Sequence, residues 1–137
     1  MRFENPSNDE IKQLLNENKR IAVVGLSDNP ARTSYMVSEA MQKAGYEIIP
    51  VNPKADEILG VKAVGSLKEI DGKIDIVNVF RRSEFLPEVA KETVEVGANV
   101  FWAQLGVENE EAYEILQQKG IQTVMNRCIK VEQAKWK

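Results

Sequence analysis

Short apolar runs that suit buried strands alternate along this sequence with stretches of helical periodicity. Residues 21–24 read Ile-Ala-Val-Val and end at Gly25. A strand that is covered on both faces needs such a continuous run, without alternating polar residues. Val37 and Met41 then follow helical spacing, and Gly45 stands where a helix C-terminal cap belongs. Strict alternation of this kind implies parallel strands joined by right-handed crossover helices.

The same pattern repeats to the end of the chain. The expected elements are an N-terminal helix over about residues 7–18, strands at 46–51, 61–64, 74–80, 99–103 and 121–125, a helical turn at 66–70, helices around 85–94 and 112–116, and a C-terminal helix from about residue 129. We therefore expect one three-layer α/β/α Rossmann-like domain over residues 1–137, with a mainly parallel sheet of five or six strands. The strand at 21–24 should be central, because it is the most apolar and precedes a reversal of strand order.

The composition narrows the class of protein. A chain of 137 residues that is 43% hydrophobic and 28% charged has enough apolar surface for one core. Its net charge of −3 argues against a general binder of nucleic acid or of anionic membranes. The apolar runs are too short to span a membrane, and residues 1–10 lack the apolar core of a signal peptide, so we expect a cytoplasmic location.

Histidine is absent from the sequence, and Cys128 is the single cysteine. These two facts exclude Ser-His-Asp and Cys-His catalysis, histidine-ligated metals, an internal disulfide and a thiolate zinc cluster. The residues that remain form no recognisable catalytic constellation, which favours a binding protein over an enzyme.

Cations and small polar residues follow the predicted strands. The residues of interest are Gly25, Ser27, Arg32, Thr33 and Ser34 after the first strand, Asn52, Pro53 and Lys54 after the second, Arg81 and Arg82 after the third, Gln104 and Gly106 after the fourth, and Asn126 and Arg127 after the fifth. Carboxyl ends of parallel strands meet at one edge of a sheet, and ligands of such sheets bind there.

Clustered cations repel one another, so an anion normally compensates them. The amino ends of the following helices add N–H groups and positive dipole ends at the same edge. Taken singly, each of these residues is expected to cap a helix or to solvate a loop. As a set they indicate a bound polyanion, for which we expect a phosphorylated nucleotide.

The first turn, Gly25-Leu26-Ser27-Asp28-Asn29-Pro30, lacks the second and third glycines of a dinucleotide fingerprint. The position where NAD-binding proteins carry an acid for the ribose hydroxyls holds Asn52, and Lys54 follows it. A cation there suits a phosphorylated ribose, which leaves open the 2′-phosphate of NADP and the 3′-phosphate of coenzyme A. A Walker lysine motif is absent, which argues against ATP or GTP hydrolysis.

Five stretches together carry a family resemblance: residues 22–27 (AVVGLS), 46–54 (YEIIPVNPK), 77–81 (VNVFR), 102–106 (WAQLG) and 126–128 (NRC). With them the chain resembles the small stand-alone coenzyme A-binding proteins of bacteria and archaea, and it is similar to the N-terminal coenzyme A-binding domain of the succinyl-CoA synthetase α subunit. The resemblance implies that coenzyme A lies across the carboxyl edge of the sheet. It implies that Gly25 and Ser27 line the phosphate turn, that Arg32 and Lys54 contact phosphate, and that Phe80, Arg81 and Arg82 flank the adenine or pantetheine path. Gln104, Gly106 and Asn126 would line the rest.

The resulting hypothesis is a coenzyme A or acyl-CoA binding protein without catalysis of its own. The phosphorylated histidine of the synthetase lies in a second domain, so its reaction is not implied here. An NADP-dependent oxidoreductase is an alternative, although Tyr35, Tyr46 and Tyr113 stand in no Tyr-x-x-x-Lys setting. A second alternative is the coenzyme A-binding subunit of an acyl-CoA ligase that another chain completes. A second copy of this chain is also a candidate partner.

Several apolar side chains are expected in the core, among them Trp102, Met36, Met41 and Met125. Cys128 is expected to be a small, partly buried space-filling residue. The alternative for Cys128 is a mixed disulfide with the coenzyme A thiol under oxidation, because nearby cations raise the thiolate fraction.

Overall fold

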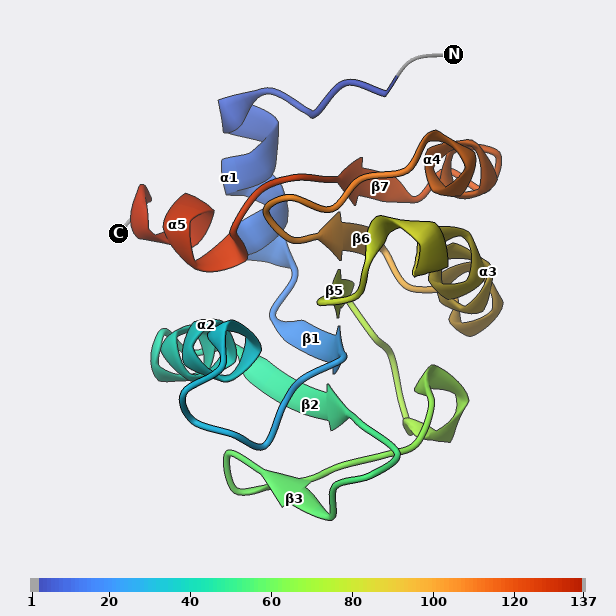
Figure 1. The fold of residues 1–137 in the computed structure, drawn as a ribbon. Helices are drawn as coiled ribbons and strands as arrows, with labels where there is room; N and C mark the ends of the chain where they lie inside the picture. Colours follow the sequence, from blue (N-terminus) through green and yellow to red (C-terminus); the bar gives the residue numbers. More distant parts are fainter. Residues whose placement is uncertain (1–2, 137) are drawn as a thin grey trace.

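The computed structural model describes residues 3–136 and contains a five-stranded parallel sheet in the order β2-β1-β5-β6-β7 (Figure 1). The strands are β1 (Arg20–Val24), β2 (Glu47–Val51), β5 (Ile76–Val79), β6 (Val100–Ala103) and β7 (Gln122–Val124). Every strand pair in this sheet is parallel. The predicted parallel sheet and its number of strands are thereby confirmed.

Helices cover both faces of the sheet, as Figure 1 shows. The helices α1 (Asn8–Glu17), α2 (Thr33–Lys43) and α5 (Ile129–Ala134) lie on one face, and α3 (Leu86–Val96) and α4 (Glu110–Gln117) lie on the other. Each face has its own apolar cluster: Leu14 and Met41 belong to the first, and Val89 and Leu116 belong to the second. The three-layer α/β/α prediction is confirmed.

The prediction that the strand at residues 21–24 is central was wrong in detail. β1 is second from the edge of the sheet, and β5 is the middle strand. A continuous apolar run indicates that both faces of a strand are covered. The strands β5 and β6 are fully buried as well, so such a run does not identify the middle strand. The predicted reversal is present, because the chain moves from β1 to β2 on one side and then returns to β5 on the other.

A small hairpin, β3 (Glu57–Ile58) paired with β4 (Val61–Lys62), and a 3₁₀ turn, η1 (Leu67–Glu69), fill the connection from β2 to β5. The strand expected at 61–64 is shorter than predicted, and β3 was not predicted. A two-residue strand has no periodicity that a sequence could display. Val64 also bonds to the outer edge of β2, where its N–H donates to the carbonyl of Pro50. Pro50 is tolerated there because β2 is an edge strand.

Local signals for the ends of helices proved accurate. Ser7 caps α1 through a capping box with Glu10, and Gly97 ends α3 in the left-handed conformation. The expected burial of Trp102, Met41 and Met125 is confirmed.

Met36 was wrongly predicted to lie in the core, since it is 48% exposed. Val37 and Met41 are buried, and Met36 points about 100° away from Val37 and about 140° away from Met41 around α2. Within residues 3–136, no helix is long and apolar enough to cross a membrane.

Candidate functional site

Two adjoining cavities open at the carboxyl edge of the sheet, and Arg81 borders both. The first, here called the polar cavity, has a volume of about 580 Å³ and is lined by Val24, Gly25, Ser27, Val51, Asn52, Pro53, Lys54, Gly65, Ser66, Arg81, Val89 and Glu92. The second, here called the apolar cavity, has a volume of about 660 Å³ and is lined by Thr33, Phe80, Arg81, Arg82, Ser83, Gln104, Leu105, Gly106, Val107 and Cys128. The reversal of strand order between β1 and β5 brings these segments together.

The turn after β1 can be built only with glycine at its first position. Gly25 has a φ of +87°, and a Cβ atom there would lie 2.5 Å from the carbonyl oxygen of Phe80. The next part of the turn is held by Ser34, whose Oγ accepts a hydrogen bond from the Ser27 N–H at 3.0 Å. Ser34 is buried, so it positions the turn rather than facing the cavity.

The turn after β2 is fixed to the turn after β1 by Asn52. Its Nδ2 donates to the carbonyl of Leu26 at 3.0 Å, and its Oδ1 accepts from the Lys54 N–H at 2.9 Å. The side-chain amide therefore joins the two turns and sets the backbone from which the exposed Lys54 side chain projects.

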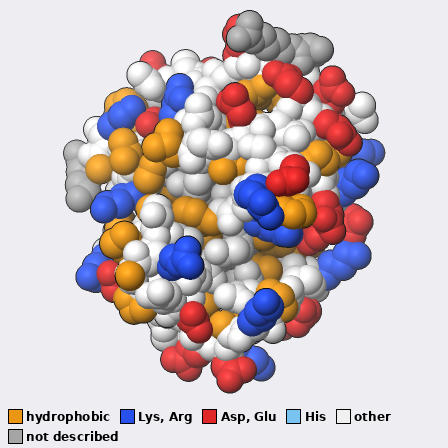
Figure 2. All heavy atoms as spheres, viewed as in Figure 1, with side chains coloured by type: hydrophobic (Ala, Val, Ile, Leu, Met, Phe, Trp, Pro, Cys, Tyr) orange, Lys and Arg blue, Asp and Glu red, His pale blue; other side chains and the backbone are white. Residues whose placement is uncertain are grey.

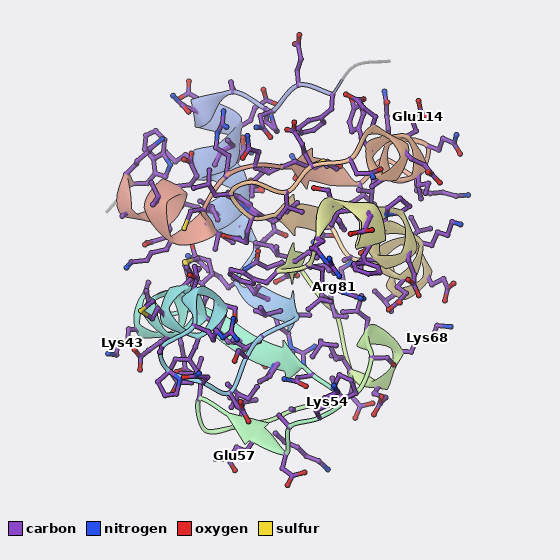
Figure 3. The ribbon with its side chains drawn as sticks, viewed as in Figure 1. Lys43, Lys54, Glu57, Lys68, Arg81 and Glu114 are labelled. Carbon is purple, nitrogen blue, oxygen red and sulfur yellow. The ribbon has the colours of Figure 1, made fainter. Side chains whose placement is uncertain are left out.

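The turn after β5 presents two guanidinium groups. Both stack on Phe85, with Cζ 4.4 Å from the ring centroid for Arg81 and 5.6 Å for Arg82. Arg82 also lies 3.6 Å from the carboxylate of Glu84. Figure 3 shows Arg81 and Lys54 on the same face of the molecule, one after β5 and the other after β2.

The turns after β6 and β7 are joined by Asn126. Asn126 has a φ of +58°, and its Oδ1 accepts a hydrogen bond from the Gly106 N–H at 2.7 Å. Gln104 lies deeper and is 5% exposed; its amide donates to Asn78 and accepts from the Ile129 N–H. Both side chains hold the wall of the apolar cavity, of which Leu105 forms the outer rim at 71% exposure.

The structure brings most of the predicted site residues into these cavities. Gly25, Ser27, Asn52, Pro53, Lys54 and Arg81 line the polar cavity, while Thr33, Phe80, Arg82, Gln104 and Gly106 line the apolar cavity together with Arg81. Ser34 and Asn126 stand behind the walls and hold them through hydrogen bonds. Arg32 and Arg127 are exposed and line neither cavity.

Sequence reasoning missed the contribution of α3 to the polar cavity. Val89 and Glu92 stand one turn apart on that helix, and both line the cavity. A buried valine and a half-buried glutamate are ordinary residues in an amphipathic helix, so the local pattern contains no signal for them. Leu105 and Val107 were missed for a similar reason, because the sequence marks their loop by the polar Gln104 and by Gly106, and apolar loop residues carry no signal of their own.

Figure 2 shows several Lys and Arg side chains near the centre of this face, with hydrophobic ones between them. Within residues 3–136, no carboxylate lies within ion-pairing distance of Arg32, Lys54, Arg81 or Arg127. Unpaired cations around a cavity suit an anionic ligand. No group of three or more metal-ligating side chains is found in the described part of the chain.

Helix α3 carries two carboxylates near the polar cavity, Glu92 in its lining and Glu95 one turn further along. Glu95 lies 2.9 Å from the ammonium group of Lys68. The hydrogen bond and charge of Glu95, followed by the more distant charge of Glu92, raise the pKa of Lys68 above its usual value. Glu92 itself has no hydrogen bond or ion pair within the residues that the structure describes.

A sequence model of a family described as CoA binding domain matches residues 19–134. The chain belongs to the CoA binding domain family. The match spans all five strands and both cavities, so the resemblance inferred from the five motifs is confirmed.

Within the CoA binding domain family, the chain is 68% identical to the uncharacterized protein YneT of Bacillus subtilis, over 96% of this chain and 98% of YneT. It is 29% identical to the α subunit of acetate–CoA ligase (ADP-forming) II of Pyrococcus furiosus, and that alignment covers 80% of this chain but only 26% of the ligase subunit. A solved structure, a hypothetical protein from Pyrococcus horikoshii, matches with a TM-score of 0.92 and 32% identity over 99% of both chains. This chain and that Pyrococcus horikoshii protein therefore share one fold over almost the whole of both chains.

Proposed function

We propose that this protein binds coenzyme A across the carboxyl edge of its sheet and has no catalysis of its own. The observation that carries the proposal is the pair of adjoining cavities that share Arg81, of which the one next to Lys54 has the larger polar share of its lining. Coenzyme A has the matching form, with a phosphorylated nucleotide at one end and an uncharged pantetheine arm at the other. Membership of the family supports the same ligand.

The phosphate groups go to the polar cavity in this proposal. Gly25 lets backbone approach the pyrophosphate closely, and Ser27 contributes a hydroxyl. Lys54 pairs with the 3′-phosphate, and Arg81 lies where the pyrophosphate passes from one cavity to the other. Each of these cations gains a partner that the described protein atoms do not supply.

The pantetheine arm lies in the apolar cavity, against Phe80, Leu105 and Val107. Burying its methylene and methyl groups there adds affinity without any charged contact. The thiol reaches the neighbourhood of Cys128, which is half-buried and unpaired. Cys128 also packs against the core cluster on the α2 face, in keeping with its expected space-filling role.

The test is titration calorimetry and thermal shift with coenzyme A, acetyl-CoA, NADP and ADP in parallel. At about 100 times its dissociation constant, a bound ligand adds roughly 2.7 kcal/mol to the free energy of unfolding. Coenzyme A and acetyl-CoA should bind more tightly than ADP, which lacks the pantetheine arm. A preference for NADP over coenzyme A would contradict the proposal and favour an oxidoreductase.

The proposed contact between Lys54 and the 3′-phosphate can be tested with two ligands that differ only in that phosphate. Lys54→Glu should weaken coenzyme A by about tenfold more than it weakens dephospho-coenzyme A, because only the former carries the 3′-phosphate. Equal losses for the two ligands would show that Lys54 does not contact that phosphate.

A second candidate function is that of the coenzyme A-binding part of an acyl-CoA ligase completed by another chain. It is favoured by the likeness to the Pyrococcus ligase subunit, of whose length this chain matches 26%. Mixing the protein with a chain that carries the remaining ligase domains should then give a complex on size-exclusion chromatography and coenzyme A-dependent ligase activity. Absence of both complex and activity would contradict this second function.

A further inference from the structure

The polar cavity contains a carboxylate that its phosphate-binding role does not explain. Glu92 is the one acidic side chain among the lining residues of that cavity, which also include Lys54 and Arg81. It is half-buried, and within residues 3–136 it has neither a hydrogen bond nor an ion pair. The charge of Lys68 acts on it from a greater distance, but the described protein supplies no hydrogen-bond donor to its carboxylate, so a bound ligand can supply one.

The walls near Glu92 are apolar. Val89 stands one helical turn before it on α3, and Val51 ends β2; both are buried and both line the cavity. Val24 and Pro53 add further apolar surface. Such walls suit a flat heteroaromatic ring, but apolar contact alone does not distinguish one purine from another.

We infer that Glu92 is a specificity-determining residue that accepts a hydrogen bond from the exocyclic amine of an adenine base seated between Val51 and Val89. This inference rests on the proposed function, since it places the nucleotide end of coenzyme A in the polar cavity. It adds which base the site selects and which side chain selects it.

The ribose hydroxyl next to the 3′-phosphate is the other donor that a nucleotide offers. A carboxylate bound to that hydroxyl would stand within several ångströms of a phosphate dianion, and such a contact costs on the order of 4 kcal/mol per pair of charges near a protein surface. The exocyclic amine lies at the end of the nucleotide away from its phosphates. The amine therefore fits a carboxylate that lines the same cavity as the phosphate-binding Lys54 and Arg81.

The test compares coenzyme A with its deaminated analogue, in which hypoxanthine replaces adenine and a carbonyl oxygen replaces the amine. The wild-type protein should bind coenzyme A about tenfold more tightly, because the analogue sets a carbonyl where the amine donates and its N1–H donor lies in a different position. Glu92→Leu should lower the affinity for coenzyme A about tenfold and abolish the discrimination. Glu92→Gln, whose amide can donate to the carbonyl, should shift the preference toward the analogue.

Glu95→Gln is the matched control, since Glu95 lies one turn further along α3, pairs with Lys68 and lines neither cavity. It should leave the discrimination unchanged. An unchanged ratio in Glu92→Leu and Glu92→Gln, with coenzyme A still bound, would overturn the inference and leave the proposed function intact. If the Glu92 variants instead lose discrimination between ADP and 2′-deoxy-ADP and keep that between the two bases, Glu92 contacts the ribose, and the inference is overturned too. Failure of the wild-type protein to bind coenzyme A would overturn both.

Discussion

Charged side chains at the two edges of the parallel sheet differ in whether other protein groups pair with them. At the amino edge, the Arg20 side chain donates to the carboxylate of Glu47 at 3.1 Å and to the carbonyls of Asp71 and Lys73 at 2.8 and 2.9 Å. The carboxylate of Asp75 accepts from the backbone N–H groups of residues 19 and 20 there. At the carboxyl edge, Lys54 and Arg81 have no carboxylate partner within the described residues.

The difference separates charges that hold the fold from charges that await a ligand. Arg20 is satisfied by the protein itself, so its contacts contribute to the free energy of folding. Lys54 and Arg81 at the other edge line a cavity, and their side chains make no hydrogen bond or ion pair within the described residues. Substitutions at the two edges should therefore affect different measurements.

The largest effect is expected at Gly25, where the carboxyl edge meets the backbone of the fold. Gly25→Ala adds a Cβ atom 2.5 Å from a main-chain oxygen at a φ of +87°, so either the turn or β5 must move. We expect a loss of about 3 kcal/mol in the free energy of unfolding, measured by urea denaturation, together with loss of coenzyme A binding.

Gly120→Ala is the control, because Gly120 also has a positive φ, +69°, but its Cβ would meet nothing within 4 Å. That change should cost only about 1 kcal/mol and leave binding intact. Equal effects of the two substitutions would show that the close approach to Phe80 is not what requires glycine at position 25.

Next in size is a pair of matched substitutions, one at each edge. Lys54→Met should leave the free energy of unfolding within about 0.5 kcal/mol of the wild type while it lowers the affinity for coenzyme A about tenfold. Arg20→Met should lower the free energy of unfolding by about 2 kcal/mol, since it removes three hydrogen bonds, and leave the affinity unchanged. The opposite distribution of effects would contradict the division between the edges.

A smaller effect on stability and binding is expected for Asn126, whose side chain holds the loop of Gly106 that lines the apolar cavity. Asn126→Gly keeps the left-handed backbone but removes the hydrogen bond to the Gly106 N–H, at a cost of about 1 kcal/mol in stability. Calorimetry should then show weaker binding of coenzyme A and unchanged binding of ADP, which does not enter the apolar cavity. Equal weakening of both ligands would mean that the two cavities are not separate subsites.

The smallest expected effect is the pH dependence of stability that comes from Tyr46, which packs against α1. The Tyr46 hydroxyl donates to the carbonyl of Leu15 at 2.8 Å, and burial raises the pKa of Tyr46 above its usual value. Its contribution is therefore fully present below about pH 10 and is lost as pH rises through the raised native pKa. Urea denaturation between pH 8 and 11 should show a steeper loss for the wild type than for Tyr46→Phe. Parallel curves would contradict this role of Tyr46.

The sequence predicted the order of elements well because each strand and helix has its own local signal. The continuous run at 21–24, the capping box at Ser7 and the glycine at position 97 were each sufficient to place an element. The rank of β1 in the sheet was not predictable in this way. Several fully buried strands carry the same pattern, and only tertiary contacts decide their order.

In the candidate site, too, some residues were predictable from local sequence and others depended on tertiary packing. Residues that directly follow strands, such as Lys54 and Arg81, were predictable because parallel topology brings strand ends together. Glu92 was not, because its place in the cavity depends on how α3 packs against the sheet. Arg32 and Arg127 follow strands too, yet they line neither cavity, and sequence spacing does not specify the direction of an exposed loop side chain.

The hydrogen bonds that Ser34 accepts and Asn52 donates have a kinetic consequence. The first fixes the β1 turn to α2 and the second joins the β1 and β2 turns, so the site is preorganised and little chain entropy is lost on binding. Association should then proceed in a single step, without a slow induced-fit phase. Affinity differences among variants of Lys54 and Arg81 should consequently reside in the dissociation rate.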